Sequence, residues 1–350
     1  MKSPFKSLSL IAACALASVS VHAQVNLTAE TSSKGSIPHY VVSHLAEVAS
    51  AAKVANLQVA EGQTLTNSLL NIAEGKSDVS AAPLILPFMM SKGVGPYSAL
   101  GKEKGAAMAG NLRALYPYNS GGYFMLAFDS KGFKGWEDLK GKTVYNGPPR
   151  GAALTNARQA MTMNTGMTDG KEYKGLQANW DAVDAMLVDG SADAYVLPLT
   201  MPHARISVMQ AAGKVALYSS SKAAMESEVG KKMLSLPGNI PIVLKKEDTG
   251  YANDPNVRLV SEDGYMRGLG TAFADVVNKD MSFDLAKALT AAHIKTLNAL
   301  KAKAPALKNI GLAEMDPSKS SFCGMSPLKY HPGAVAAWKE AGYTIPACAQ

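Results

Sequence analysis

Long hydrophobic runs are absent from this chain after its first residues. No later segment reaches the roughly 18 consecutive apolar residues that a membrane-spanning helix needs, so we expect no stable membrane insertion. At the start, Lys2 and Lys6 precede an apolar stretch over 8–21, and Val21-His22-Ala23 ends it with small residues where a leader peptidase reads. The sequence predicts a signal peptide over 1–23, cleavage after Ala23 and export to the periplasm. Lipid attachment at Cys14 is the alternative, although the apolar run before it would be unusually short.

Cysteine is scarce, with three residues in 350. Cys14 leaves with the leader, so Cys323 and Cys348 remain as an even pair. In an oxidising compartment this pair predicts one disulfide, which closes a loop of about 25 residues, staples the C-terminal tail and contributes on the order of 3 kcal/mol in the chain-entropy model. A reactive thiol or metal pair is the alternative, and His331 is the histidine that such a site would use.

Concentrated charge and aromatic side chains are also lacking. The formal net charge of +7 falls to +5 when Lys2 and Lys6 are removed, and no basic block or interleaved aromatic pattern follows. This charge pattern is not that of a nucleic-acid-binding protein. An aromatic share of 7% offers no strong stacking platform for a sugar, which favours small polar acids as ligands. The hydrophobic share of 47% and a mature chain of roughly 330 residues favour two compact domains.

One pattern occurs twice: an apolar helical stretch, a glycine, an aspartate three residues later, and a proline eight residues after the glycine. The first copy contains Gly75, Asp78 and Pro83, and the second contains Gly190, Asp193 and Pro198. Glycine ends the helix, the next run forms a strand, and proline closes that strand without needing its N–H. Two αβ units of one layout predict two similar lobes, although such a pattern also recurs by chance. Ligands of α/β sheets bind beyond the carboxyl ends of the strands, so the cleft between the lobes is the expected site.

Signatures of an exported enzyme are missing. The sequence contains no Gly-x-Ser-x-Gly, no His-Glu-x-x-His and no zinc-like spacing of cysteine and histidine. Ser219 to Lys222 spells Ser-x-x-Lys, but its partner motifs are absent and a helix cap at Ser221 explains it more simply. We interpret His331 as a turn residue, and Asp78 and Asp193 as helix-to-strand residues of different lobes. No catalysis, cofactor or metal is therefore expected.

Several motifs together point to a known family. They are the serine-rich first loop, Gly75-Lys76-Ser77-Asp78 after its helix, Asp138-Leu139-Lys140-Gly141-Lys142, Gly147-Pro148-Pro149 and His331-Pro332-Gly333-Ala334. In this layout the chain resembles the TAXI family of TRAP transporter solute receptors. The resemblance implies a two-lobed receptor that closes on a small solute and delivers it to a membrane permease driven by an ion gradient.

The fold expected from the resemblance is α/β, a type II-like periplasmic binding protein with a ligand cleft between the lobes. Each lobe is expected to be a doubly wound, mostly parallel sheet with flanking helices. We place lobe 1 at 24–118 and 266–350, and lobe 2 at 119–265. The Gly- and Pro-rich stretch over 116–122 and the segment 265–277 would be the crossings, and 282–303 would be one long helix capped by Ser282.

Two departures from the family pattern affect the site. Lys34 replaces a glycine in the first loop, and Arg150-Gly151-Ala152-Ala153 replaces a Gly-Ser-Gly-Thr pattern. Backbone N–H groups after Gly151 and the planar guanidinium of Arg150 predict a grip on a carboxylate. For Arg150 an exposed charge or an interlobe salt bridge is the alternative, and for Lys34 an exposed charge.

Other candidates are ambiguous between ligand contact and local structure. The serines of the first loop donate to a ligand or cap the helix, Gln63 and Thr64 share this ambiguity, and Tyr123 is a strand aromatic that lines the core or the cleft. The predicted ligand-binding residues are Ser32, Ser33, Lys34, Ser36, Gln63, Thr64, Pro83, Tyr123, Gly147, Arg150, Gly151, Ala152, Pro198 and Thr200.

The predicted function is a monomeric periplasmic receptor for a small anionic solute: an amino acid, dicarboxylate, keto acid or aromatic acid. Its second partner would be a TRAP permease. An envelope sensor or adaptor of the same fold is the first alternative, and an exported Ser-x-x-Lys hydrolase is the second.

Overall fold

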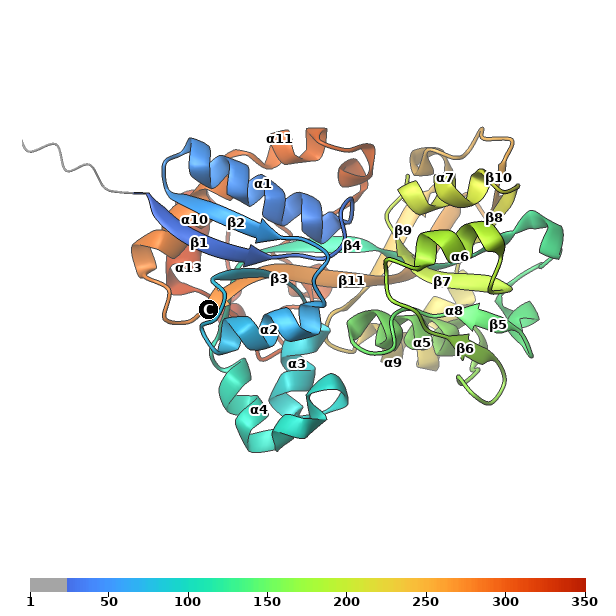
Figure 1. Cartoon of the computed structure of the whole chain (residues 1–350), viewed down its shortest axis with the longest axis horizontal. Coiled ribbons are helices and arrows are strands. Elements are labelled where there is room, and N and C mark those ends of the chain that lie inside the picture. The colour runs from blue at the N-terminus through green and yellow to red at the C-terminus, as the bar shows by residue number, and fades with distance from the viewer. Residues whose placement is uncertain (1–23) are drawn as a thin grey trace, which may run out of the picture.

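A computed structural model describes residues 24–350, so the predicted signal peptide and Cys14 lie outside the described residues. The chain forms one twelve-stranded sheet whose central path runs β2-β1-β3-β11-β4-β7-β5-β6. The long strands β4 (Leu112–Phe128) and β11 (Tyr265–Asn278) pair antiparallel and pass through both halves of the molecule (Figure 1). They connect the two lobes.

The remaining strands group on either side of these two. They are β1 Val25–Glu30, β2 Ala55–Ala60, β3 Val79–Pro83, β5 Thr143–Tyr145, β6 Lys174–Leu176, β7 Ala194–Leu199, β8 Val215–Tyr218, β9 Asn239–Lys245, β10 Val257–Val260 and β12 Lys329–Tyr330. Strand β1 pairs parallel with β2 and β3, and β5 pairs parallel with β6 and β7. The sheet as a whole is mixed, because β4 and β11 run antiparallel to β7 and β3.

Helices cover both faces of the sheet (Figure 1). They are α1 Ile37–Ala51, α2 Leu65–Ala73, α3 Ile85–Lys92, α4 Gly101–Ala109, α5 Ala152–Thr165, α6 Val183–Asp189, α7 Ala204–Gln210, α8 Lys222–Glu226, α9 Glu228–Leu234, α10 Phe283–Lys295, α11 Leu297–Ala302, α12 Pro317–Ser320 and α13 Pro332–Glu340. Within residues 24–350, none of them has the length and apolarity to cross a bilayer.

The hydrophobic core is divided between the lobes. One cluster takes its buried residues from 27–118 and 272–349, with Ile240 added. Two further clusters lie on the faces of the other half and use residues 123–269. The predicted two-lobed α/β architecture is confirmed, while the lobe boundaries given above stay a prediction.

The repeated unit has one structural role in both lobes. The Asp78 carboxylate accepts the Thr28 N–H at 2.8 Å, and the Asp193 carboxylate accepts the Thr143 N–H at 3.0 Å. In return the Asp78 and Asp193 N–H groups donate to the carbonyls of Thr28 and Thr143. Gly75 and Gly190 end the preceding helices with φ of +70° and +67°. Both aspartates are helix-to-strand residues, as predicted, and each also bonds the start of its strand to a parallel neighbour.

Two local predictions need correction. The segment 116–122 does pass between the lobes, but it is a strand rather than a Gly- and Pro-rich loop, because it lies inside β4 and pairs with β11. The helix expected over 282–303 is two helices separated at Thr296, whose hydroxyl donates back to the Ala292 carbonyl at 2.8 Å. Ser282 caps α10 as predicted, accepting the Leu285 N–H at 3.3 Å.

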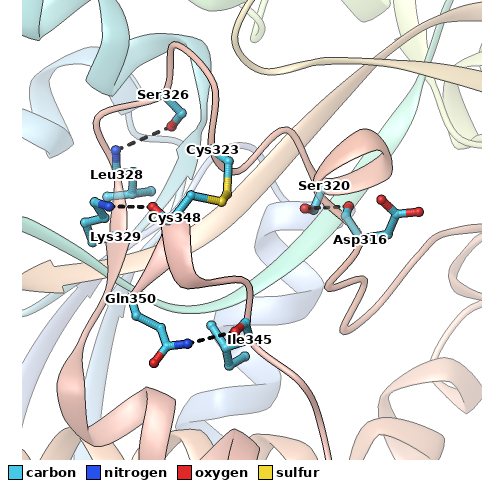
Figure 2. Close-up of a disulfide and its surroundings, with 9 residues drawn as sticks. All are labelled: Asp316, Ser320, Cys323, Ser326, Leu328, Lys329, Ile345, Cys348 and Gln350. Atoms are coloured by element: carbon cyan, nitrogen blue, oxygen red, sulfur yellow. Dashed lines mark hydrogen bonds between the residues drawn. A yellow bond between two sulfur atoms is a disulfide. The ribbon is translucent and has the colours of Figure 1, made fainter.

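The C-terminal tail is held by the predicted disulfide between Cys323 and Cys348 (Figure 2). Beside it, the ammonium of Lys329 donates to the Cys348 carbonyl, and the Gln350 side chain donates to the Ile345 carbonyl at 2.8 Å. Lys329 belongs to β12, which pairs with β4. The tail is therefore attached to the first lobe next to a crossing strand.

Candidate ligand site between the lobes

The first lobe contributes two adjacent loops. The loop after β1 and the loop after β2 are joined by three backbone hydrogen bonds of 2.9 to 3.0 Å: Thr31 N–H to the Ala60 carbonyl, Gly62 N–H to Ser32, and Gln63 N–H to Thr31. Helices α1 and α2 begin directly after these loops. The carboxyl ends of β1 and β2 thus bring two helix N-termini to the same edge of the sheet.

The second lobe contributes the loop after β5. Gly147 and Gly151 have φ of +109° and +100°, a region that favours glycine, and Gly151 caps α5. The Thr155 N–H and hydroxyl both donate to the Gly151 carbonyl, at 3.3 and 3.1 Å. A Cβ added at Gly151 would lie 3.0 Å from Oγ1 of Thr66, in the first turn of α2. The N-termini of α5 and α2 therefore meet across the junction of the lobes.

These helix ends carry partial positive charge, and their own first turns supply no carboxylate against it. The first turns of α1, α2 and α5 contain no acidic residue, and no side chain caps α2 or α5. The first backbone N–H groups of a helix lack partners within it and carry partial positive charge. Two such ends facing each other form a surface that an anion stabilises.

Several predicted residues make local contacts. The hydroxyls of Ser32 and Ser36 lie 2.7 Å apart, and Ser36 caps α1 by accepting the His39 N–H at 3.3 Å. The Ser33 carbonyl accepts the Ser36 N–H, and the Gln63 amide donates to the Glu61 carbonyl at 3.0 Å. For Ser36 the capping alternative is thus seen directly.

The predicted cations lie on the surface. Lys34 and Arg150 are exposed, and within residues 24–350 neither is paired with a carboxylate. Both side chains are exposed charges in this structure, which is the alternative given above. Contact of either with a ligand stays a prediction. Thr64 is exposed as well, while Ala152 packs against the core of the first lobe.

The predicted strand-end residues lie where the lobes join. Tyr123 in β4 pairs with Pro198 in β7, and Pro83 in β3 pairs with Phe273 in β11. Tyr123 is 3% exposed, and burial raises the pKa of its hydroxyl above the usual range. Thr200 follows β7 and is also buried. Tyr123 and Thr200 therefore belong to the floor of the junction rather than to an open cleft wall.

The sequence analysis missed a set of buried polar groups here. Thr31 Oγ1, Ser68 Oγ and Asn156 Oδ1 are buried and find no hydrogen-bond partner among residues 24–350. The Asn156 amide donates to the hydroxyl of Thr271 in β11 at 2.8 Å. A polar residue on the apolar face of a predicted helix was the available signal for Asn156 and Ser68. For Thr31 the sequence offered only its position directly after a strand.

The Ser-x-x-Lys sequence has structural roles. The Ser219 hydroxyl donates to the Ser220 carbonyl at 2.7 Å, Ser221 caps α8, and the Lys222 ammonium lies 3.8 Å from the Glu226 carboxylate. His331 caps α13 by accepting the Gly333 N–H at 3.1 Å, while its other nitrogen faces the Met281 carbonyl at 2.9 Å. The cap and turn interpretations of Ser221 and His331 are confirmed.

A cavity of about 440 Å³ lies at the opposite edge of the first lobe. It is lined by the end of α2, the start of β3 and the β11–α10 connection, including Glu74, Asp78 and Asp280. It borders the amino ends of β1 and β3, whereas the candidate site lies at their carboxyl ends. We assign it no role in the candidate site.

The fold is the two-lobed α/β architecture of periplasmic solute-binding proteins. Residues 30–342 match the NMT1-like family, and the chain belongs to that family. No curated protein matches it in sequence.

Several solved structures are similar to this chain at low sequence identity. A protein from Bordetella bronchiseptica RB50 is 12% identical, with a TM-score of 0.52 over 91% of this chain and 99% of that chain. A TRAP periplasmic solute-binding protein from Ralstonia eutropha H16 with bound (S)-2-acetolactate is 14% identical, with a TM-score of 0.44 over 90% of each chain. The periplasmic aliphatic sulphonate-binding protein SsuA from Escherichia coli is 14% identical, with a TM-score of 0.38 over 55% of this chain, which spans only 58% of SsuA.

Proposed function

We propose that this protein is an exported solute receptor of the TAXI type that holds one small carboxylated solute between its lobes and delivers it to a TRAP permease. The observation that carries the proposal is the meeting of the α5 and α2 N-termini at Gly151 and Thr66. Both ends lack acidic residues and side-chain caps. Membership of the NMT1-like family supports a binding protein rather than an enzyme.

Closure follows from electrostatics. Two positive helix ends repel each other when the lobes approach, and a carboxylate between them turns this repulsion into attraction. The solute then binds the closed form more tightly than the open form, which is what shifts a population towards closure. Among the predicted residues, Ser33 and Gln63 would contact the solute from the first lobe and Arg150 from the second.

Buried hydroxyl and amide groups support a ligand with polar substituents. Thr31, directly after β1, Ser68 in α2 and Asn156 in α5 each have a buried oxygen without a partner among residues 24–350, and these are the elements that carry the candidate site. Buried polar atoms are normally hydrogen-bonded. A polar acid offers such partners, whereas a purely apolar ligand does not.

The test is a thermal-shift screen of the mature protein. The panel contains two acids with their neutral amides, succinate with succinamide and benzoate with benzamide. It also contains L-glutamate, 2-oxoglutarate and a set of sugars. A ligand at roughly a thousandfold over its Kd adds about 4 kcal/mol, on the order of 10 °C in Tm. We expect a shift with one class of acids and none with its amides. A shift with sugars or amides alone contradicts carboxylate recognition.

Delivery to a permease distinguishes transport from signalling. An envelope sensor of the same fold would bind the same solute and close in the same way. A neighbouring gene for a large multi-spanning permease supports uptake, and a neighbouring histidine-kinase gene supports the sensor.

A further inference from the structure

One histidine links the two loops of the first lobe. His39 lies in the first turn of α1 and is 9% exposed. Its Nδ1 accepts the Gly35 N–H at 3.3 Å, and its Nε2 lies 2.9 Å from Oε1 of Glu61, in the loop after β2. The two hydrogen bonds of a single ring thus connect 31–36 with 61–64.

The hydrogen bonds fix the tautomer of the ring. Because Nδ1 accepts a backbone N–H, the ring proton is on Nε2, which donates to the Glu61 carboxylate. The neutral ring satisfies both partners at once. The backbone of His39 is also held, since its N–H donates to Ser36.

The linkage reaches the part of the loop that backbone pairing leaves free. The three backbone bonds between the loops involve only Thr31 and Ser32 of the first loop, which lie at its base, and Ala60, Gly62 and Gln63 opposite them. The tip at Lys34 and Gly35 is reached through His39, and Gly35 has a φ of +80°. Glu61 is the single acidic residue of the two loops, 31–36 and 61–64. Bonded to His39, its carboxylate is kept in one place beside a surface that favours anions.

We infer that His39 and Glu61 form a positioning pair that holds these two loops as one preorganised surface and so sets the affinity for the solute without contacting it. This rests on the proposed function. Ordering a loop before binding removes an entropic cost that binding would otherwise include. Loss of the pair therefore weakens binding while leaving the core, and with it the Tm, nearly unchanged.

The test combines hydrogen–deuterium exchange of the ligand-free protein with calorimetric Kd values for succinate, 2-oxoglutarate, L-glutamate and benzoate. Glu61→Ala removes the acceptor, whereas Glu61→Gln keeps an acceptor oxygen and removes the charge. His39→Asn keeps an acceptor for Gly35, and His39→Gln keeps a donor for Glu61. Glu74→Ala is the matched control, because Glu74 is another exposed glutamate of the first lobe and pairs with Lys76 at the opposite sheet edge.

We expect Glu61→Ala to accelerate exchange over 31–36 and to weaken acid binding about tenfold, with Tm close to that of the wild type. Glu61→Gln should restore slow exchange and most of the affinity, and Glu74→Ala should change neither. Wild-type exchange and affinity in Glu61→Ala overturn the inference. If no acid binds the wild type, the proposed function fails, and unchanged exchange in Glu61→Ala rejects the pair separately.

Discussion

At the scale of single residues, a buried carboxyl on a crossing strand is the least expected feature. Asp275 of β11 is fully buried and accepts the hydroxyls of Tyr116 and Tyr118 of β4, at 2.7 and 2.9 Å. Burial raises its pKa to about 7 against these two hydrogen bonds. His293 stacks on Tyr116 with ring centroids 3.6 Å apart, and burial lowers the pKa of His293 to about 3. These groups make stability depend on pH in opposite directions.

The sign follows from proton binding. Between pH 4 and 7, Asp275 keeps a proton in the folded protein that it has lost in the unfolded chain. Its contribution to the free energy of unfolding therefore falls as the pH rises. His293 stays neutral in the folded protein while the unfolded chain takes up a proton, so its contribution to the free energy of unfolding falls as the pH falls from 6.5 towards 3. We expect Asp275→Asn to remove the loss of stability that Asp275 causes as the pH rises. The difference between the Tm of the variant and the Tm of the wild type should therefore increase by several degrees from pH 5 to pH 8. A parallel pair of Tm profiles would contradict this.

A second residue-scale prediction concerns Arg150. If its guanidinium grips the carboxylate, Arg150→Ala should weaken binding of the acid found in the screen by roughly 10- to 100-fold, as for the loss of a charged hydrogen bond. Lys140→Ala is the control, since Lys140 is another exposed cation of the second lobe. Calorimetry measures the Kd of each variant for the acid. Equal Kd values for Arg150→Ala and wild type would show that Arg150 is only an exposed charge.

At the scale of elements, the approach of α5 to α2 requires a glycine. Gly151 and Gly166 flank the same helix with positive φ, but only Gly151 faces another element, whereas a Cβ at Gly166 meets open space. Gly151→Ala should cost more stability than Gly166→Ala, about 1 to 3 kcal/mol against about 1 kcal/mol, because the φ of +100° and ψ of −167° at Gly151 are adopted almost only by glycine, whereas Gly166 is in the left-handed helical region. Only Gly151→Ala should also weaken acid binding. Equal affinities of the two variants would contradict closure at this contact.

The tail disulfide is the second element-scale case. Replacing Cys323 and Cys348 with serine should lower the free energy of unfolding by on the order of 3 kcal/mol, because the unfolded chain regains loop entropy. The bridge lies beside β12 and not at the junction. Denaturant unfolding should show the loss, and the Kd for the acid should stay at its wild-type value.

At the scale of the whole molecule, we expect the lobes to move about the two crossing strands. Strand β11 shifts register against β4 between Gly270 and Thr271 and again between Asp275 and Val276. Such irregularities bend a strand locally, and the shift at Gly270 and Thr271 falls between the core clusters of the two lobes, so we place the hinge at that shift. Small-angle scattering should report a smaller radius of gyration with the acid than without it. An unchanged radius, with binding shown by calorimetry, would contradict hinge closure.

Features that depend on near neighbours in the chain could be predicted from the amino-acid sequence. The repeated Gly-x-x-Asp units, the caps at Ser221 and Ser282, the turn at His331, the cysteine pairing and the two-lobed α/β fold were all predictable, because each follows from local backbone chemistry, a count or a motif. Contacts between residues that are distant in sequence became visible only in the folded protein. The structure showed Gly151 against Thr66, His39 bonded to Glu61, and Asp275 enclosed by two tyrosines. It also showed that pairing with β11 makes 116–122 a strand, because long-range hydrogen bonds outweigh the local preference of glycine and proline.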